Sequence, residues 1–323
     1  MNRIPYKDKL DWLSKRETGI GGSDVAAVLG ISRWKSPIEV YLKKTGKFYK
    51  EITDEEQLER MRIGQLEEEV IATLFCEKMN IEHNRLRQAN FVFQHEDYPF
   101  MLGSIDRQYT DDDGKKVIVE CKHASEYTYS DWDEKKVPLE YLCQLMHYLI
   151  ITDADYGYFA VKIGNRTVKI KRVERDQELE AKIINAEKYF WENYVEKDVL
   201  PPADGSIPTK EILDGYLDEV LGEMEEERVE VNLDKEDYHK IEKRAELKSQ
   251  INELENKVRE IDNSIKQKLI ERMGNVGLIG NYEFSVKTVI SKRIDTKRLK
   301  EDNIYDKYAK ESTYQKINIK EVS

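Results

Sequence analysis

The chain has 323 residues, enough for one large domain with an appendage or for two modest domains. Its net charge of −11 argues against a protein that coats nucleic acid by electrostatics alone. Residues 211–230 hold nine acids and one base, so most of this negative charge lies in one segment and a basic groove can exist elsewhere. The sequence contains neither a run of about 18 apolar residues nor an apolar signal-peptide core, and its three cysteines are far apart, so we expect a cytoplasmic protein with no membrane span.

The first 80 residues predict helices separated by glycine-containing turns. A glycine-rich turn leads into a helix over residues 23–29, whose N-cap we assign to Ser23 or Asp24. Residues 30–44 contain a second turn and a short helix. Apolar residues at helical spacing then predict a long amphipathic helix over residues 55–79.

The next segment reads as strands followed by helices. This order predicts an α/β fold with a central mixed sheet flanked by helices. The predicted strands are 91–93, 100–109, 117–121, 156–163 and 167–173, with a turn at 111–116 and helices at 138–151 and 176–195.

The character of the chain changes beyond Pro208. We therefore divide it into a domain at 1–205 and a C-terminal module at 206–323. Within the module, residues 274–280 end the predicted helix, residues 282–290 form a strand, and a charged tail starts at Lys292. A short coiled-coil seam is predicted in the module because apolar residues alternate four- and three-residue steps. The seam comprises Leu247, Ile251, Leu254, Val258, Ile261 and Ile265.

Asp106, Glu120 and Lys122 form the pattern that carries chemistry. Hydrolysis of a phosphodiester needs an activated water and relief of charge on the phosphate, which divalent metals held by carboxylates supply. Residues two apart on a strand share a face, so Glu120 and Lys122 point the same way and Cys121 points away. Glu-x-Lys occurs five times in this chain, and only Glu120 ends a buried apolar strand. The local pattern leaves two readings open, a catalytic site or a structural ion pair.

Three weaker signals accompany this pattern. The long helix offers Glu67, Glu68 and Glu69, most of which are ordinary surface acids, and Gln144 and Tyr148 share one helix face. Glycines ahead of the helix at residue 23 can present backbone N–H groups to a phosphate, although a capped turn is the simpler interpretation.

The motifs together resemble a known family. Residues Trp12 to Asp24 read W-x-x-x-R-x-x-G-I-G-G-S-D, and KSPIEVYLKKTGK, G-x-x-x-E (Gly64 to Glu68), the Asp, Glu-x-Lys and Q-x-x-H-Y elements follow in order. This series is similar to the YqaJ-type viral recombinases, which are relatives of lambda exonuclease with a PD-(D/E)xK nuclease core. The resemblance covers about residues 10–200.

The resemblance implies a site and a reaction. Asp106, Glu120 and the main-chain carbonyl of Cys121 would bind Mg²⁺, for which Mn²⁺ can substitute, and Lys122 would position the attacking water. Glu68 would support the metal; the family often has Leu-Glu-Pro where this chain has Glu67-Glu68-Glu69, so Glu67 stays an alternative. Gln144 would assist the metal or the substrate phosphate, with Tyr148 beside it. Arg16 and Ser23 would contact a terminal 5′-phosphate or the nearby DNA backbone.

The expected function is therefore that of a phage- or prophage-encoded exonuclease in a bacterial host. It would digest one strand at double-stranded DNA ends for a single-strand annealing partner, with the C-terminal module assembling a homo-oligomer or docking that partner. Two alternatives for the function stay open: an endonuclease of the same fold, and a non-catalytic DNA or protein adaptor. A third alternative concerns the C-terminal module, which would then be only a helical brace on the nuclease core, with its seam in a hairpin with the acidic helix at 211–228. The presence of Asp106, Glu120 and Lys122 together favours an enzyme over the adaptor.

Overall fold

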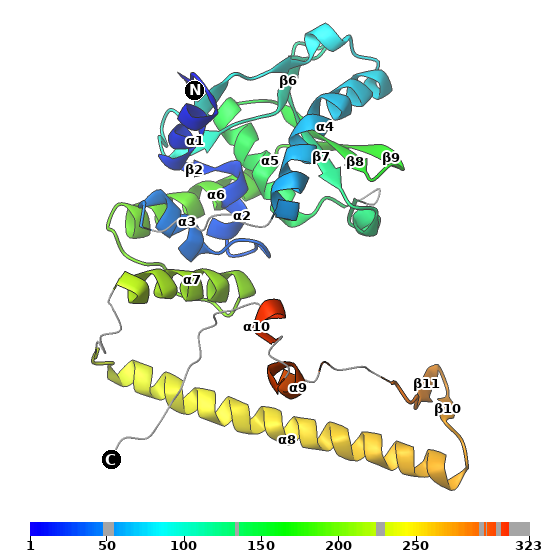
Figure 1. Ribbon diagram of the computed structural model, residues 1–323. Coiled ribbons are helices and arrows are strands. Elements are labelled where there is room, and N and C mark those ends of the chain that lie inside the picture. Colours follow the sequence, from blue (N-terminus) through cyan, green and yellow to red (C-terminus); the bar gives the residue numbers. More distant parts are fainter. Residues whose placement is uncertain are drawn as a thin grey trace. The chain divides into compact units, whose positions relative to one another are not determined.

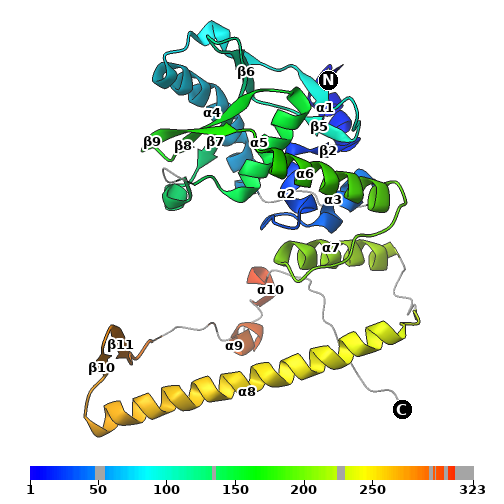
Figure 2. The same cartoon turned by 180° about the vertical axis from the view of Figure 1, so that it is seen from behind.

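The chain divides by its contacts into two compact units, Met1–Met224 and Glu225–Ser323. The computed structural model describes residues 1–47, 55–132, 136–223, 230–290, 294, 296–301 and 305–309 (Figures 1 and 2). Helix α7 (Ile207–Glu223) belongs to the first unit, where it packs on α3 and buries Ile212 in the core. The division of function at 205/206 stays a prediction.

Helices in the first unit are α1 (Lys9–Glu17), α2 (Gly22–Val28), α3 (Pro37–Lys44), α4 (Glu55–Met79), α5 (Leu139–Thr152), α6 (Gln177–Phe190) and α7, with the short helices η1 (His83–Arg85), η2 (Glu126–Trp132) and η3 (Trp191–Val195). Its strands are β1 (Asn2–Pro5), β2 (Ile20–Gly21), β3 (Arg87–Gln88), β4 (Phe91–Gln94), β5 (Met101–Gly103), β6 (Arg107–Thr110), β7 (Lys116–Ala124), β8 (Tyr156–Ile163) and β9 (Thr167–Glu174).

A five-stranded mixed sheet of order β3-β6-β7-β8-β9 forms the centre of this unit. Only β7 and β8 run parallel, because α5 connects them as a crossover, whereas the other neighbours are antiparallel. Val119 and Cys121 on one face pack with α4, and Ile118 on the other face packs with α5. The expected mixed sheet flanked by helices is confirmed.

The prediction of one strand over residues 100–109 is wrong. The segment forms β5 in a second sheet, of order β1-β4-β5-β2, and then β6 in the main sheet. The chain must cross between two sheets, and residues 104–106 make that crossing outside any strand. Asp106 consequently lies just before β6, next to the pair Arg107↔Val119.

Several element ends also differ from expectation. Gly21, not Ser23 or Asp24, is the N-cap of α2, because the buried Asp24 carboxylate turns back and accepts from the Gly21 N–H at 3.2 Å. The helix expected at 176–195 is regular only to Phe190 and then widens into the π-helical turn η3. Strand β7 extends beyond the predicted 117–121 to Ala124.

The second unit contains one helix of 37 residues, α8 (Lys235–Glu271). After it come β10 (Val276–Ile279), β11 (Tyr282–Ser285), α9 (Thr296–Glu301) and α10 (Tyr305–Tyr308). The predicted strand 282–290 is shorter than expected and pairs with β10, inside the segment that we expected to be only a break. The tail beyond residue 309 lies outside the described residues.

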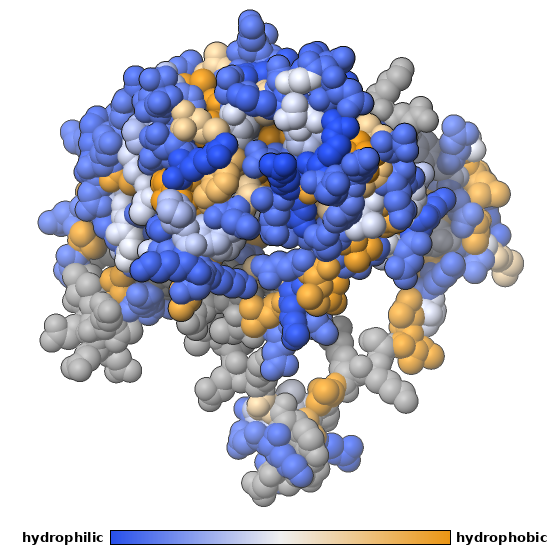
Figure 3. All heavy atoms as spheres, turned by 90° about the horizontal axis from the view of Figure 1, so that it is seen from above, coloured by the Kyte–Doolittle hydropathy of each residue, from blue (hydrophilic) through white to orange (hydrophobic). Residues whose placement is uncertain are grey.

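Hydrophilic side chains predominate on the face shown in Figure 3, as a charged fraction of 36% predicts. Within the described part of the chain, every helix is too short or too polar to cross a bilayer.

Candidate active site

A cavity of about 710 Å³ brings most of the predicted site residues together. Helices α1, α4 and α5 and strand β7 contribute to its lining. The predicted residues that line it are Arg16, Glu68, Asp106, Glu120, Cys121, Lys122, Gln144 and Tyr148. Ser23 is exposed beside it and is not among the lining residues.

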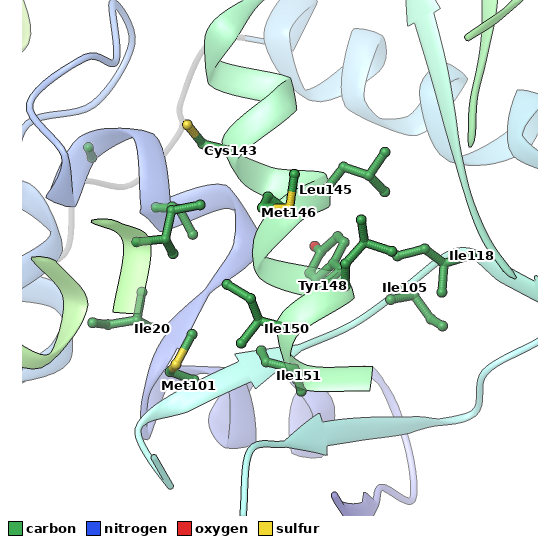
Figure 4. Close-up of a cluster of buried hydrophobic side chains, with 14 of the residues drawn as sticks. Ile20, Met101, Ile105, Ile118, Cys143, Leu145, Met146, Tyr148, Ile150 and Ile151 are labelled. Atoms are coloured by element: carbon green, nitrogen blue, oxygen red, sulfur yellow. The ribbon is translucent and has the colours of Figure 1, made fainter. Parts of the chain in front are cut away.

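Strand β7 and helix α5 join their polar side chains in one chain of contacts. Lys122 Nζ lies 3.2 Å from Glu120 Oε2 and also donates to Gln144 Oε1 at 3.2 Å. Gln144 Nε2 donates to the Tyr148 hydroxyl at 3.2 Å, one helical turn further along α5. Figure 4 shows the Tyr148 ring among apolar neighbours such as Ile118, where it is buried. The expected shared face of Glu120 and Lys122 is therefore present.

Asp106 is held against the same strand. Its Oδ2 accepts a hydrogen bond from the Cys121 N–H at 2.8 Å, while Arg107 Nη1 donates to the Asp106 carbonyl at 2.8 Å. The pairing of Arg107 with Val119 places Asp106 next to Glu120. Asp106, one residue before the first pair of the β6–β7 ladder, therefore approaches Glu120, a contact that the sequence left open.

The three consecutive glutamates of α4 point to different partners because successive helical residues are about 100° apart. Glu67 lies 2.9 Å from Lys162 Nζ and 2.9 Å from His123 Nδ1. Glu69 Oε2 lies 2.7 Å from Arg107 Nη2. Only Glu68 of the three lines the cavity, so the geometry favours Glu68 over Glu67 as the helix carboxylate.

Burial and crowding raise the pKa values of two carboxyl groups. Burial first, and then the negative charge of Asp106, raise the pKa of Glu120 to about 8 despite the opposing effect of Lys122. Burial and the charge of Asp106 raise the pKa of Glu68 to about 7. Burial alone would lower the pKa of Lys122, but Glu120 and Asp106 outweigh it and hold that pKa above its usual value. The cluster therefore carries an excess of acidic groups that a cation would relieve.

The donor set fits a hard divalent cation. Glu120 Oε1 is buried and has no hydrogen-bond partner, which is costly for a carboxylate unless another group binds it. Among the described residues, no group of three or more His, Cys, Asp or Glu side chains has the spacing to hold a metal ion. Mg²⁺ usually takes only one or two protein carboxylates and completes its shell with water and substrate oxygens. Asp106 and Glu120, with the Cys121 carbonyl, are the residues that would hold it.

The glycine-rich segment places a cationic side chain at the edge of the cavity. Arg16 Nη2 donates to Ser23 Oγ at 3.3 Å, and its guanidinium lies 4.5 Å from the Trp12 ring centroid. Trp12 is itself held by Ser104, whose Oγ accepts from Nε1 at 3.1 Å. The sequence pattern had pointed to Arg16 and Ser23, whereas the contribution of Ser104 depends on the crossing between the sheets.

A buried ion cluster supports this segment and was missed by sequence reasoning. Asp24 is 5% exposed, and its oxygens lie 2.8 Å from Lys35 Nζ and 2.9 Å from Lys44 Nζ. Lys44 also donates to the Arg16 carbonyl at 3.0 Å. An acid at the third position of a helix usually reads as a solvated cap, so no sequence signal marked this cluster.

The histidine of the α5 motif has a different role from its neighbours. His147 and Glu187 are both fully buried, 2.8 Å apart, and the other ring nitrogen lies 2.9 Å from the Leu102 carbonyl oxygen. This pair joins α5 to α6 and β5. His147 therefore has a core role, and the three free, buried cysteines also lie in the packing.

Comparison with known proteins gives one family. The model of the YqaJ-like viral recombinase domain matches residues 11–155. The protein YqaJ of Bacillus subtilis (strain 168) is 35% identical over 317 residues, which cover 97% of this chain and 94% of that protein.

Solved structures with a related outline are more distant. An alkaline exonuclease (LHK-Exo) from Laribacter hongkongensis is 16% identical with a TM-score of 0.48, and the match covers 67% of this chain and all of the other. A phage-related exonuclease from Haemophilus somnus 129PT is 14% identical with a TM-score of 0.41, over 55% of this chain and 96% of the other.

Proposed function

Because the chain belongs to the family of YqaJ-like viral recombinase domains, we propose that it is a divalent-metal-dependent DNA exonuclease. Its substrate is the end of double-stranded DNA, with a 5′-phosphate, and its product is a single strand for an annealing partner in phage-type recombination within a bacterial cytoplasm. The observation that carries the proposal is one cavity lined by Asp106, Glu120 and Lys122. In it Lys122 Nζ lies 3.2 Å from Glu120 Oε2, the Asp106 carboxylate accepts from the neighbouring Cys121 N–H, and Glu120 Oε1 has no hydrogen-bond partner.

The acidic residues of the cavity would hold the ion. Mg²⁺, or Mn²⁺ in its place, would be held by Asp106, Glu120 and the Cys121 carbonyl. When bound, such an ion lowers the pKa of a water and neutralises charge on the scissile phosphate. Glu68 lines the same cavity and would support the ion directly or through a water.

Lys122 acts as a charged donor. Its Nζ lies 3.2 Å from Glu120 Oε2 and 3.2 Å from Gln144 Oε1, where it would orient the attacking water and stabilise the phosphate oxygens. Gln144 fixes the direction of this ammonium through the 3.2 Å contact, and Tyr148 fixes Gln144 in turn. Tyr148 is therefore proposed as a positioning residue at the wall of the site, while Arg16 and Ser23 receive the 5′-phosphate or backbone.

The test compares linear and closed DNA. With Mg²⁺ present, linear duplex with a 5′-phosphate should be consumed and covalently closed circles spared, and EDTA should stop the reaction. Nicking of closed circles at an equal rate would favour the endonuclease alternative. Duplex that stays intact in Mg²⁺ and in Mn²⁺ would favour the non-catalytic adaptor.

Lys122→Ala tests the assigned chemistry. Loss of the charged donor should lower the cleavage rate by at least about 100-fold while the fold and much of the DNA binding persist. Lys182→Ala is the matched control, since that lysine is exposed on α6 and, among the described residues, its ion pair is with Glu178 in the preceding turn. Unchanged cleavage by Lys122→Ala would refute the mechanism.

A further inference from the structure

A second cavity, of about 670 Å³, adjoins the candidate active site. Gln88 and Phe91 line both cavities. Side chains alternate along β7, so Lys116 and Ile118 point to the same sheet face as Glu120. Lys116 lies four residues from Glu120, about 13 Å along the strand. The second cavity is thus the continuation of the same sheet face away from the carboxylates.

The charge of this cavity is opposite to that of the chain as a whole. Arg3, Arg85, Arg87 and Lys116 line it, and aspartate and glutamate are absent from the described residues of its lining. Arg85 is already paired with Asp112 at 2.7 Å. Within the described chain, Arg87 and Lys116 are exposed and make no ion pair, so their charges face solvent. We call this cavity the basic groove.

Aromatic side chains lie beside these cations. Phe91 is half-buried at the junction of the two cavities, 4.7 Å from the Phe93 ring, and the Arg3 guanidinium lies 4.9 Å from its centroid. A cationic groove with aromatic surface is the arrangement that binds single-stranded nucleic acid, because only unpaired bases offer their faces for stacking.

We propose that the basic groove binds single-stranded DNA and guides a strand leaving or approaching the candidate active site. That the bound strand is DNA rests on the proposed function. Arg87 and Lys116 contact phosphates, and Phe91 offers its edge or face to a base at the point where the two cavities meet.

The experiment measures binding without cleavage. Fluorescence anisotropy of a labelled single-stranded oligonucleotide in EDTA, over a range of salt, compares Arg87→Gln/Lys116→Gln with Lys115→Gln/Lys182→Gln. The control pair removes the same two charges from positions outside the groove, one of them adjacent to Lys116. Each lost phosphate contact should reduce the salt slope by about 0.7 and weaken binding roughly 5-fold at 0.1 M salt, so the groove variant should bind roughly 25-fold more weakly.

The outcomes separate this proposal from the proposed function. Equal affinities and equal salt slopes in the two double variants would overturn the groove, whether or not wild type cleaves DNA. A larger loss for duplex than for single strands would also overturn it, because the groove would then hold paired DNA. If wild type shows no cleavage with any divalent ion but the groove variant still loses affinity, the nuclease assignment fails and the groove stands.

Discussion

The buried carboxylate of Asp24 offers the sharpest test of how the glycine-rich segment is held in place. One carboxylate serves two ammonium groups, Lys35 and Lys44, and also accepts from the Gly21 N–H. Burial alone would raise the pKa of Asp24, but the two lysines outweigh it and hold that pKa far below its usual value. Burial outweighs Asp24 at Lys44 and leaves the pKa of that lysine lowered, whereas Asp24 outweighs burial at Lys35 and raises its pKa.

Asp24→Asn keeps the size of the side chain and removes its charge. The Lys44 side chain is only 3% exposed, so the substitution leaves a buried ammonium without a counter-charge. Breaking a buried pair in this way costs about 3–5 kcal/mol of unfolding free energy. Adding Lys44→Met should recover part of the loss, because the stranded charge is then removed as well.

Urea denaturation at pH 7 measures these differences. The exposed Asp131→Asn is the control and should change stability by about 0.5 kcal/mol or less. Because the pKa of Asp24 is lowered in the folded state, its contribution is present above pH 3.8 and is lost as pH falls below that value. A loss under about 1 kcal/mol for Asp24→Asn at pH 7, or no recovery in the double variant, would refute the buried-pair reasoning.

Two further predictions concern the wall and floor of the candidate site. Gly22→Ala should destabilise the fold by about 1–3 kcal/mol and reduce cleavage, because its Cβ would lie 2.5 Å from the buried Tyr148 ring, whereas Gly205→Ala, with nothing within 4 Å, should be tolerated. In EDTA, the free energy of unfolding should fall by roughly 1.4 kcal/mol per pH unit from Glu120 between about pH 4.5 and 8, since the folded carboxyl keeps its proton to about 8 and the unfolded one does not. Glu120→Gln should remove that component, and equal slopes for wild type and variant in urea titrations between pH 5 and 7 would contradict the raised pKa.

Sequence alone determined the elements that depend on local periodicity. The bounds of α4 and of the β8–β9 hairpin follow from helical spacing and from alternation around a Gly-Asn turn, because both patterns are properties of neighbouring residues. The shared face of Glu120 and Lys122 follows from the two-residue repeat of a strand. The order of the motifs was also sufficient to indicate the family.

Tertiary structure decided what depends on residues far apart in the chain. The split of residues 100–109 between two sheets, which puts Asp106 against Cys121, results from pairing with strands that no local pattern identifies. Lys162 and His123 lie 2.9 Å from the Glu67 carboxylate while Glu68 lines the cavity, and these distant partners are why the geometry favours Glu68. Burial of Asp24 and the basic groove depend likewise on which distant lysines and arginines the fold gathers, because charge and solvation are set by the surroundings in space.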